Sequence, residues 1–223
     1  MITRRKIAMI AAEFLGTGLL TLIILAVGRS QLGAPYFIGI AAGLTLVMAT
    51  LVLGRVSGAH LNPAITIGLW SVRRIKAVPA IVYIAAQIIG AGVAYFLYSY
   101  LVGQTLENTT AGFEGKVLVA EAVGAFVFSL GWAAVVYQRL EGGRAATVLG
   151  VSLMLGMLVA SVGMGLYVNP AVALGAHSWV WGTYALGPVL GAIIGFNLYG
   201  LLFAPEKELT DAAEASARRK TIK

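Results

Sequence analysis

The sequence predicts an all-α membrane protein with six transmembrane helices and two re-entrant half-helices, arranged as an inverted three-helix repeat. Three observations lead to this prediction. Of the 223 residues, 59% are hydrophobic and only 11% are charged, whereas soluble domains carry about 25% charged residues. Six apolar segments are long enough to cross a bilayer. Two Asn-Pro-Ala triplets, at 62–64 and 169–171, precede apolar pieces that are too short to cross it.

Each long apolar segment has about the length needed to cross a hydrocarbon core of ~30 Å at 1.5 Å per residue. The first follows a basic N-terminus and could be mistaken for a signal peptide. Its apolar run of about 20 residues exceeds a signal core of 7–15 residues, so we expect a retained helix. The six segments are 7–27, 36–54, 77–102, 117–137, 145–162 and 180–203.

The two triplets predict helix starts. Asparagine is a preferred N-cap, and proline at the first helical position loses nothing because its missing N–H would have had no partner. The apolar residues that follow, at 64–71 and 170–177, allow only about two helical turns. We therefore expect two half-helices that enter the membrane and stop inside it.

The sequence also repeats. Glu121 follows Glu13 by 108 residues, and Asn169 follows Asn62 by 107. Each half, about 7–102 and 117–203, contains three spans, so the second half must enter the membrane from the opposite side. Inverted repeats of this kind place their site near the midplane of the bilayer. We expect a single transmembrane domain over 1–203.

The basic residues predict the orientation. With both termini on one side of the membrane, fourteen of the sixteen Lys and Arg residues lie on that side, and only Arg29 and Lys116 lie on the other. The positive-inside rule then places both termini in the cytoplasm and the protein in the cell membrane. The polar stretch 204–223 is expected to be a cytoplasmic C-terminal tail. This distribution explains the net charge of +7 without any nucleic acid.

No enzyme is indicated. The chain has no cysteine and only two histidines, so a thiolate nucleophile is excluded and no metal-ligand spacing exists. No nucleophile–base set and no cofactor fingerprint are found. We therefore expect neither a cofactor nor a metal.

Two acidic residues, Glu13 and Glu121, lie inside apolar spans, where an ionisable group suggests a function. One interpretation is a proton relay. The other is structural, with each carboxylate holding backbone N–H groups of the re-entrant loop in its own half. The acids precede the asparagines of the triplets by 49 and 48 residues, and this match favours the structural role. His60, two residues before the first triplet, is expected to pack or to form hydrogen bonds, with pH gating as the alternative.

Several motifs together resemble the aquaporin (major intrinsic protein) family over about residues 7–203. They are the two Asn-Pro-Ala boxes, the lead-in 57–61, the Ala-Glu starts at 12–13 and 120–121, and the segments 86–91 and 187–192. The resemblance implies a homotetramer in the lipid bilayer. It also implies a passive, single-file channel for water or another small neutral permeant, with glycerol, urea or a dissolved gas as alternatives to water.

The resemblance also implies the site. Asn62 and Asn169 would cap half-helices that meet at mid-membrane, and their amides would face the pore. The two positive dipole ends would disfavour cations there. The boxes comprise Asn62, Pro63, Ala64, Asn169, Pro170 and Ala171. The expected pore-lining backbone comprises Gly58, Ala59, His60, Leu61, Gly165, Tyr167 and Val168.

The outer constriction departs from the family pattern. By offset from the boxes, its four positions fall on Ala42, Met157, Leu166 and Val172. The family usually has arginine directly after the second box, where this chain has Val172. The sequence therefore predicts an apolar ring as selectivity filter. A wide ring would pass larger neutral solutes or gases, and a narrow one would dewet. An ion-conducting or effectively closed member of the same fold is the alternative.

Overall fold

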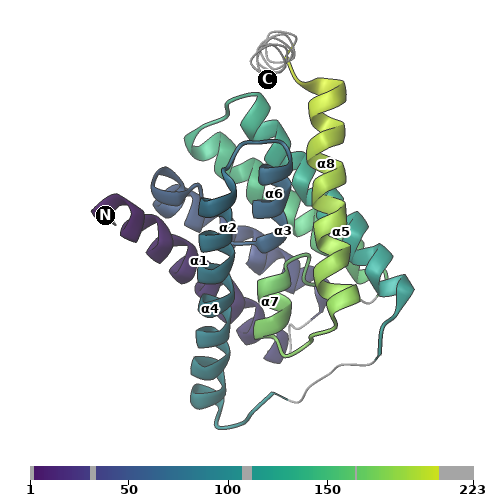
Figure 1. The fold of residues 1–223 in the computed structure, drawn as a ribbon. Coiled ribbons are helices and arrows are strands. Elements are labelled where there is room, and N and C mark those ends of the chain that lie inside the picture. Colours follow the sequence, from purple (N-terminus) through teal and green to yellow (C-terminus); the bar gives the residue numbers. More distant parts are fainter. Residues whose placement is uncertain (1–2, 31–33, 107–111, 164, 206–223) are drawn as a thin grey trace.

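The computed structural model describes residues 3–30, 34–106, 112–163 and 165–205. Within these ranges, six helical segments are long and apolar enough to cross a membrane (Figure 1). The predicted segments match them to within about three residues at every end, as expected for boundaries set by composition. They are α1 (Arg4–Arg29), α2 (Pro35–Ser57), α4 (Ala77–Val102), α5 (Gly115–Tyr137), α6 (Gly142–Ser161) and a last span made of η1 (Trp181–Leu186) and α8 (Gly187–Phe203).

The two short helices follow the two Asn-Pro-Ala triplets. Helix α3 (Pro63–Ser71) has 9 residues and α7 (Pro170–Gly175) has 6. At 1.5 Å per residue neither approaches the ~30 Å of a hydrocarbon core. The second apolar piece, 170–177, extends two residues beyond its helix. Helix α7 stops at Gly175, and the chain then turns at His177, which has a left-handed φ of 59°.

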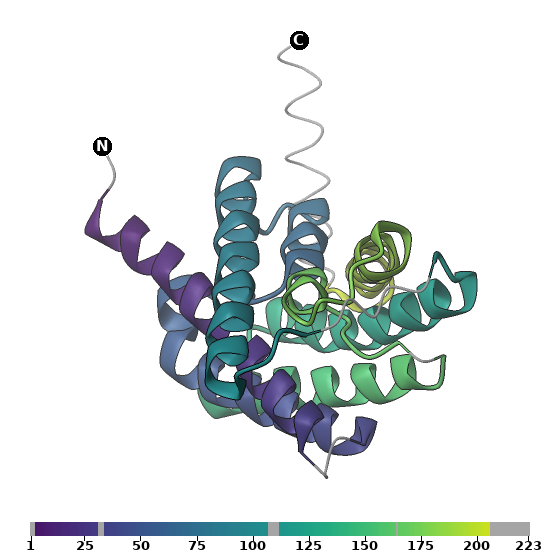
Figure 2. The ribbon, with the colours of Figure 1, turned by 90° about the horizontal axis from the view of Figure 1, so that it is seen from below.

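The packing of the helices repeats between the two halves. Helix α1 packs on α4, as α5 packs on α8, and α2 packs on α6 across the middle of the molecule. The half-helices are exchanged, because α3 packs on α8 and α7 packs on α4. Figures 1 and 2 show α3 and α7 inside the bundle of longer helices. Each half-helix therefore packs mainly on the half of the chain to which it does not belong, although α3 also contacts α4.

With six spans, α1 begins and α8 ends on the same side of the membrane. We call this the terminal side. The segment that contains α3 enters and leaves the membrane on the terminal side. The segment that contains α7 enters and leaves it on the opposite side. The predicted tail 204–223 lies almost entirely outside the described residues, which end at Pro205.

The last span differs from the uninterrupted helix that the sequence predicts. Its first six residues, Trp181–Leu186, are wound as a π-helix, and regular α-helix begins at Gly187. Pro188 accounts for the change, because it has no N–H for the carbonyl of Tyr184 and its ring would clash with that carbonyl in an α-helix.

Two glycines mark the place where the halves meet. Gly43 of α2 and Gly150 of α6 are 107 residues apart, which is the period of the repeat, and they face each other at the crossing of these helices. A Cβ added to Gly43 would lie 2.6 Å from the Gly150 carbonyl oxygen, and one added to Gly150 would lie 2.5 Å from the Gly43 oxygen. The two backbones are therefore in contact, as small residues allow in membranes.

Replacing Gly43 with alanine is expected to destabilise the protein by about 1–3 kcal/mol, because the new methyl group meets backbone that has no room to move. Gly92→Ala is the matched control in α4, since nothing lies within 4 Å of an added Cβ there. That change should be neutral or stabilising by up to about 1 kcal/mol through helix propensity. Thermal unfolding in detergent tests both, and equal melting temperatures would contradict the close crossing.

Candidate functional site

The two asparagines cap the two half-helices. The side-chain oxygen of Asn62 accepts a hydrogen bond from the N–H of Ala64 at 2.8 Å, and Asn62 has extended backbone. The side-chain oxygen of Asn169 accepts from Ala171 at 3.1 Å and from Val172 at 3.4 Å. Proline occupies the first helical position in both cases. The triplets thus start helices in the way that the sequence predicts.

The side-chain amides of the same asparagines join the two loops. Nδ2 of Asn62 donates to the carbonyl of Val168 at 2.9 Å, and Nδ2 of Asn169 donates to the carbonyl of Leu61 at 2.8 Å. Each amide has two N–H donors, so the bonds across the loops use one donor of each asparagine. The sequence predicted only that these amides face the pore, and the structure adds that each donates to a carbonyl of the other loop. The half-helices meet N-end to N-end.

The backbone before each box is held in the left-handed region. Leu61 has a φ of 49° and Val168, at the equivalent position of the second half, has a φ of 53°. This region is unfavourable for side chains with a Cβ and most unfavourable for a β-branched one such as valine. It persists only where the surroundings impose it. The two buried carboxylates supply that constraint.

Glu13 of α1 holds the first loop. Its Oε1 accepts from the hydroxyl of Ser57 at 2.6 Å and from the N–H of His60 at 3.0 Å. Its Oε2 accepts from the N–H of Leu61 at 2.8 Å and from Nε2 of Gln87 at 2.7 Å. All four partners are donors, so both carboxylate oxygens act as acceptors.

Glu121 of α5 holds the second loop. Its Oε1 accepts from the N–H groups of Leu166 at 2.7 Å and Tyr167 at 2.9 Å, and its Oε2 accepts from that of Val168 at 2.6 Å. Gly165 packs against this carboxylate, and an added Cβ there would lie 2.8 Å from Oε1. In both halves the acid binds the loop of its own half. The geometry therefore favours the structural interpretation over a proton relay.

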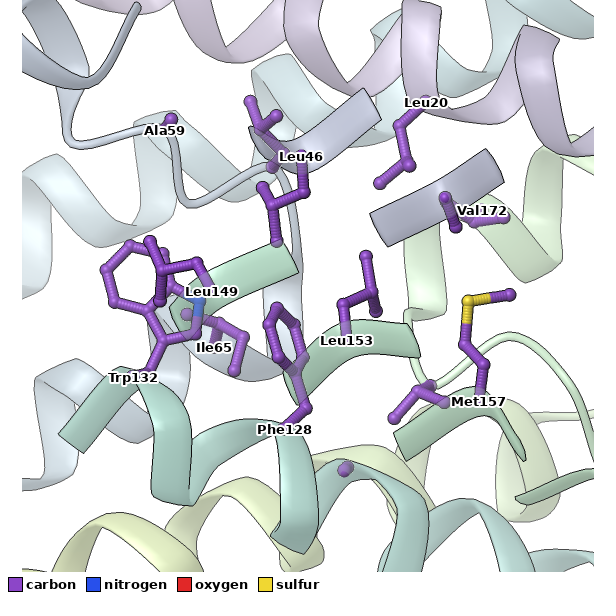
Figure 3. Packing of buried hydrophobic residues seen from close by; sticks show 14 of the residues in the cluster. Leu20, Leu46, Ala59, Ile65, Phe128, Trp132, Leu149, Leu153, Met157 and Val172 are labelled. Atoms are coloured by element: carbon purple, nitrogen blue, oxygen red, sulfur yellow. The ribbon is translucent and has the colours of Figure 1, made fainter. Parts of the chain in front are cut away.

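The four ring positions lie close together in one apolar cluster. Ala42, Met157 and Val172 are each 0% exposed, and Leu166 packs against the same cluster. Figure 3 shows the Met157 side chain extending from α6 towards Val172. An exposed fraction of zero means that no sphere of water size can touch these three side chains. The three side chains are therefore fully buried within this cluster.

Four further side chains extend the apolar ring towards the middle of the membrane. Leu20, Leu46, Phe128 and Leu153 come from α1, α2, α5 and α6, and each is at most 2% exposed. They converge with the ring residues in Figure 3. Sequence reasoning missed them. The signal was available, since Leu46 follows Ala42 by four residues and Leu153 precedes Met157 by four, so each pair shares one helix face.

His60 is packed between aromatic rings. Its imidazole lies edge-on to Tyr83 at 5.3 Å and to Trp132 at 5.4 Å between ring centroids. Its Nδ1 is 3.2 Å from the hydroxyl of Thr66. These contacts agree with the packing and hydrogen-bonding role expected from the sequence. The second histidine, His177, stacks on Tyr95 and lies on the opposite side of the membrane.

The comparisons with known proteins agree with this geometry. The chain matches the model of the major intrinsic protein family over residues 2–199. It is 32% identical to Aquaporin Z of Photorhabdus laumondii, over 89% of this chain and 98% of that protein. It is 30% identical to Aquaporin-1 of Homo sapiens, over 91% of this chain and 84% of that protein.

A similar fold is found in a solved structure. The aquaglyceroporin from Plasmodium falciparum superposes with a TM-score of 0.69 over 91% of this chain and 99% of that one, at 20% identity. The chain therefore belongs to the major intrinsic protein family, the aquaporins, whose members are passive membrane channels for water or small solutes and are not enzymes.

Proposed function

We propose that this channel conducts water and small uncharged solutes in single file, past the two Asn-Pro-Ala boxes and through an apolar filter of Ala42, Met157, Leu166 and Val172. The unit that does so is the single channel domain over 1–203, assembled as a homotetramer in the cell membrane.

The meeting of the two half-helices supports the central part of this proposal. Asn62 and Asn169 each retain one amide N–H beyond those bonded across the loops. A water oxygen or a solute hydroxyl can accept from them. The positive ends of two helix dipoles point at the same place and disfavour cations. Neutral molecules that accept hydrogen bonds are therefore favoured at the centre.

The composition of the ring supports the filter. Val172 stands where a guanidinium would offer donors and repel cations, so a solute at the ring finds only apolar side chains. An ion would lose its hydration there without compensation. The observation on which the proposed apolar filter rests is the zero exposure of Ala42, Met157 and Val172.

The same observation favours a second candidate, a pore that is effectively closed. A narrow apolar constriction dewets. Osmotic shrinkage of proteoliposomes, monitored by light scattering, separates a conducting channel from a closed pore. The vesicles are exposed first to a sucrose gradient and then to a glycerol or urea gradient. Shrinkage no faster than that of empty vesicles would overturn the channel proposal. Ion conduction is tested by the current across a planar bilayer, and we expect none above the leak.

We also propose that both termini face the cytoplasm. In the described residues, Arg55, Arg73, Arg74, Lys76, Arg139 and Arg144 lie at or near the terminal side. Because the chain has no cysteine, single cysteines report the orientation cleanly. An impermeant maleimide added to intact cells should label Glu114→Cys, which is exposed on the opposite side, and should not label Glu141→Cys, which is exposed on the terminal side. The reverse pattern would contradict the proposed orientation.

A further inference from the structure

A buried indole lies on the terminal side of the Asn-Pro-Ala boxes. Trp132 follows Phe128 by four residues on α5, so the two side chains share a helix face, and Figure 3 shows both pointing into the apolar cluster. Trp132 is 4% exposed. Neither the Asn-Pro-Ala boxes nor the filter includes this residue.

The polar atom of this indole has no partner. Nε1 of Trp132 is buried and forms no hydrogen bond with any of the described residues. Buried indole N–H groups usually find an acceptor, and an unpartnered donor in a dry interior is unfavourable. The ring of His60 stands edge-on to this indole with 5.4 Å between centroids. His60 is therefore a polar side chain in ring contact with this indole.

The surroundings of His60 indicate which of its nitrogens is free. The hydroxyl of Thr66 donates to the carbonyl of Asn62 at 3.0 Å and accepts from Nε2 of Gln87 at 3.0 Å. Its remaining acceptor site faces Nδ1 of His60 at 3.2 Å. We therefore assign the proton of the neutral imidazole to Nδ1. Nε2 is then an acceptor, and no hydrogen bond to it occurs within the described residues.

We propose that Trp132 and His60 form a second hydrogen-bonding station for the permeant, between the Asn-Pro-Ala boxes and the terminal side. A hydroxyl group accepts from Nε1–H of Trp132 and donates to Nε2 of His60. One donor and one acceptor suit a single water molecule or one hydroxyl of a small alcohol. This inference rests on the proposed function, because a permeant must reach the station through the pore.

With this station, the pore would contain an apolar region and a hydrogen-bonding region at different depths. On the outer side the ring of Ala42, Met157, Leu166 and Val172 offers no hydrogen bond. On the terminal side the aromatic pair offers both a donor and an acceptor. A permeant thus loses hydration at the ring and regains hydrogen bonds at the asparagines and then at the station.

Fluorescence of Trp132 tests the station without any transport. Replacing Trp70, Trp179 and Trp181 with phenylalanine leaves Trp132 as the single tryptophan in the full chain, and Trp70 and Trp181 are surface side chains, 50% and 71% exposed. Water bonded to Nε1 shifts indole emission to longer wavelength. We expect red-shifted emission that gains intensity in D2O. The blue emission of a dry indole, unchanged in D2O, would overturn the station.

Transport supplies the second test. Trp132→Phe keeps an aromatic ring at this position and removes the N–H together with part of the indole, so water permeability of proteoliposomes should fall roughly 2- to 10-fold, the factor expected for one hydrogen bond. Trp181→Phe is the matched control and should change nothing. Unchanged permeability in Trp132→Phe would contradict the station. A wild-type protein that conducts nothing would contradict the channel proposal instead, while the emission of Trp132 would still decide the station.

Discussion

Replacing Glu121 with alanine is expected to prevent assembly of the protein. The change removes the acceptor of three backbone N–H groups, those of Leu166, Tyr167 and Val168. A buried donor left without a partner costs about 1–3 kcal/mol, so the loss of all three partners costs roughly 3–9 kcal/mol. This is comparable with the whole stability of a typical domain, about 5–15 kcal/mol. The yield of monodisperse protein in detergent measures the effect.

A graded variant keeps this prediction testable if the alanine protein is lost. Glu121→Gln retains one carbonyl oxygen, but its NH₂ group must face at least one of the three backbone N–H groups. It should assemble with a lower melting temperature and slower water transport. The control is Glu141→Ala, which removes an exposed carboxylate that makes no capping hydrogen bond. A Glu121→Gln protein with normal stability that had lost only a pH response would favour the proton relay.

Met157→Ala is expected to open the filter. The side chain is 0% exposed and extends towards Val172 (Figure 3), so its removal should widen the proposed apolar filter and make it easier for water to enter. Permeability to glycerol and urea should rise by about tenfold or more, since 1.4 kcal/mol of barrier is a factor of ten. The cavity should also reduce stability by about 2–5 kcal/mol. Stopped-flow light scattering with each solute measures the change.

A neighbour on the same helix provides the control for the filter. Leu155 of α6 lies two residues before Met157 on the outer face and is 44% exposed, so Leu155→Ala removes a similar volume from the bundle surface. It should leave every permeability unchanged. If Met157→Ala assembles normally and its solute permeabilities equal those of the wild type, Met157 does not belong to the filter.

The sequence by itself determined the architecture, because its signals are local and strong. The lengths of the apolar segments predicted the six spans to within about three residues, because a helix that crosses the bilayer needs about 20 apolar residues. Asn-Pro at 62 and 169 fixed both half-helix starts, because capping needs only neighbouring residues. The repeat, with three spans in each half, predicted the inverted arrangement, because an odd number of spans makes the second half enter from the opposite side. The nearly equal separations of Glu13 from Asn62 and of Glu121 from Asn169 also predicted that each acid binds the loop of its own half.

Only the tertiary structure decided how the halves engage. It exchanged the half-helices, so that α3 lies on α8 and α7 on α4, and it tied Asn62 to the loop before Asn169 and Asn169 to the loop before Asn62. It also brought Phe128 and Leu153 into the apolar stretch and set Trp132 beside His60 with its N–H unpartnered. These facts join residues that are tens of residues or more apart in sequence. No local pattern encodes such contacts, because they depend on which helix faces meet once the whole bundle is packed.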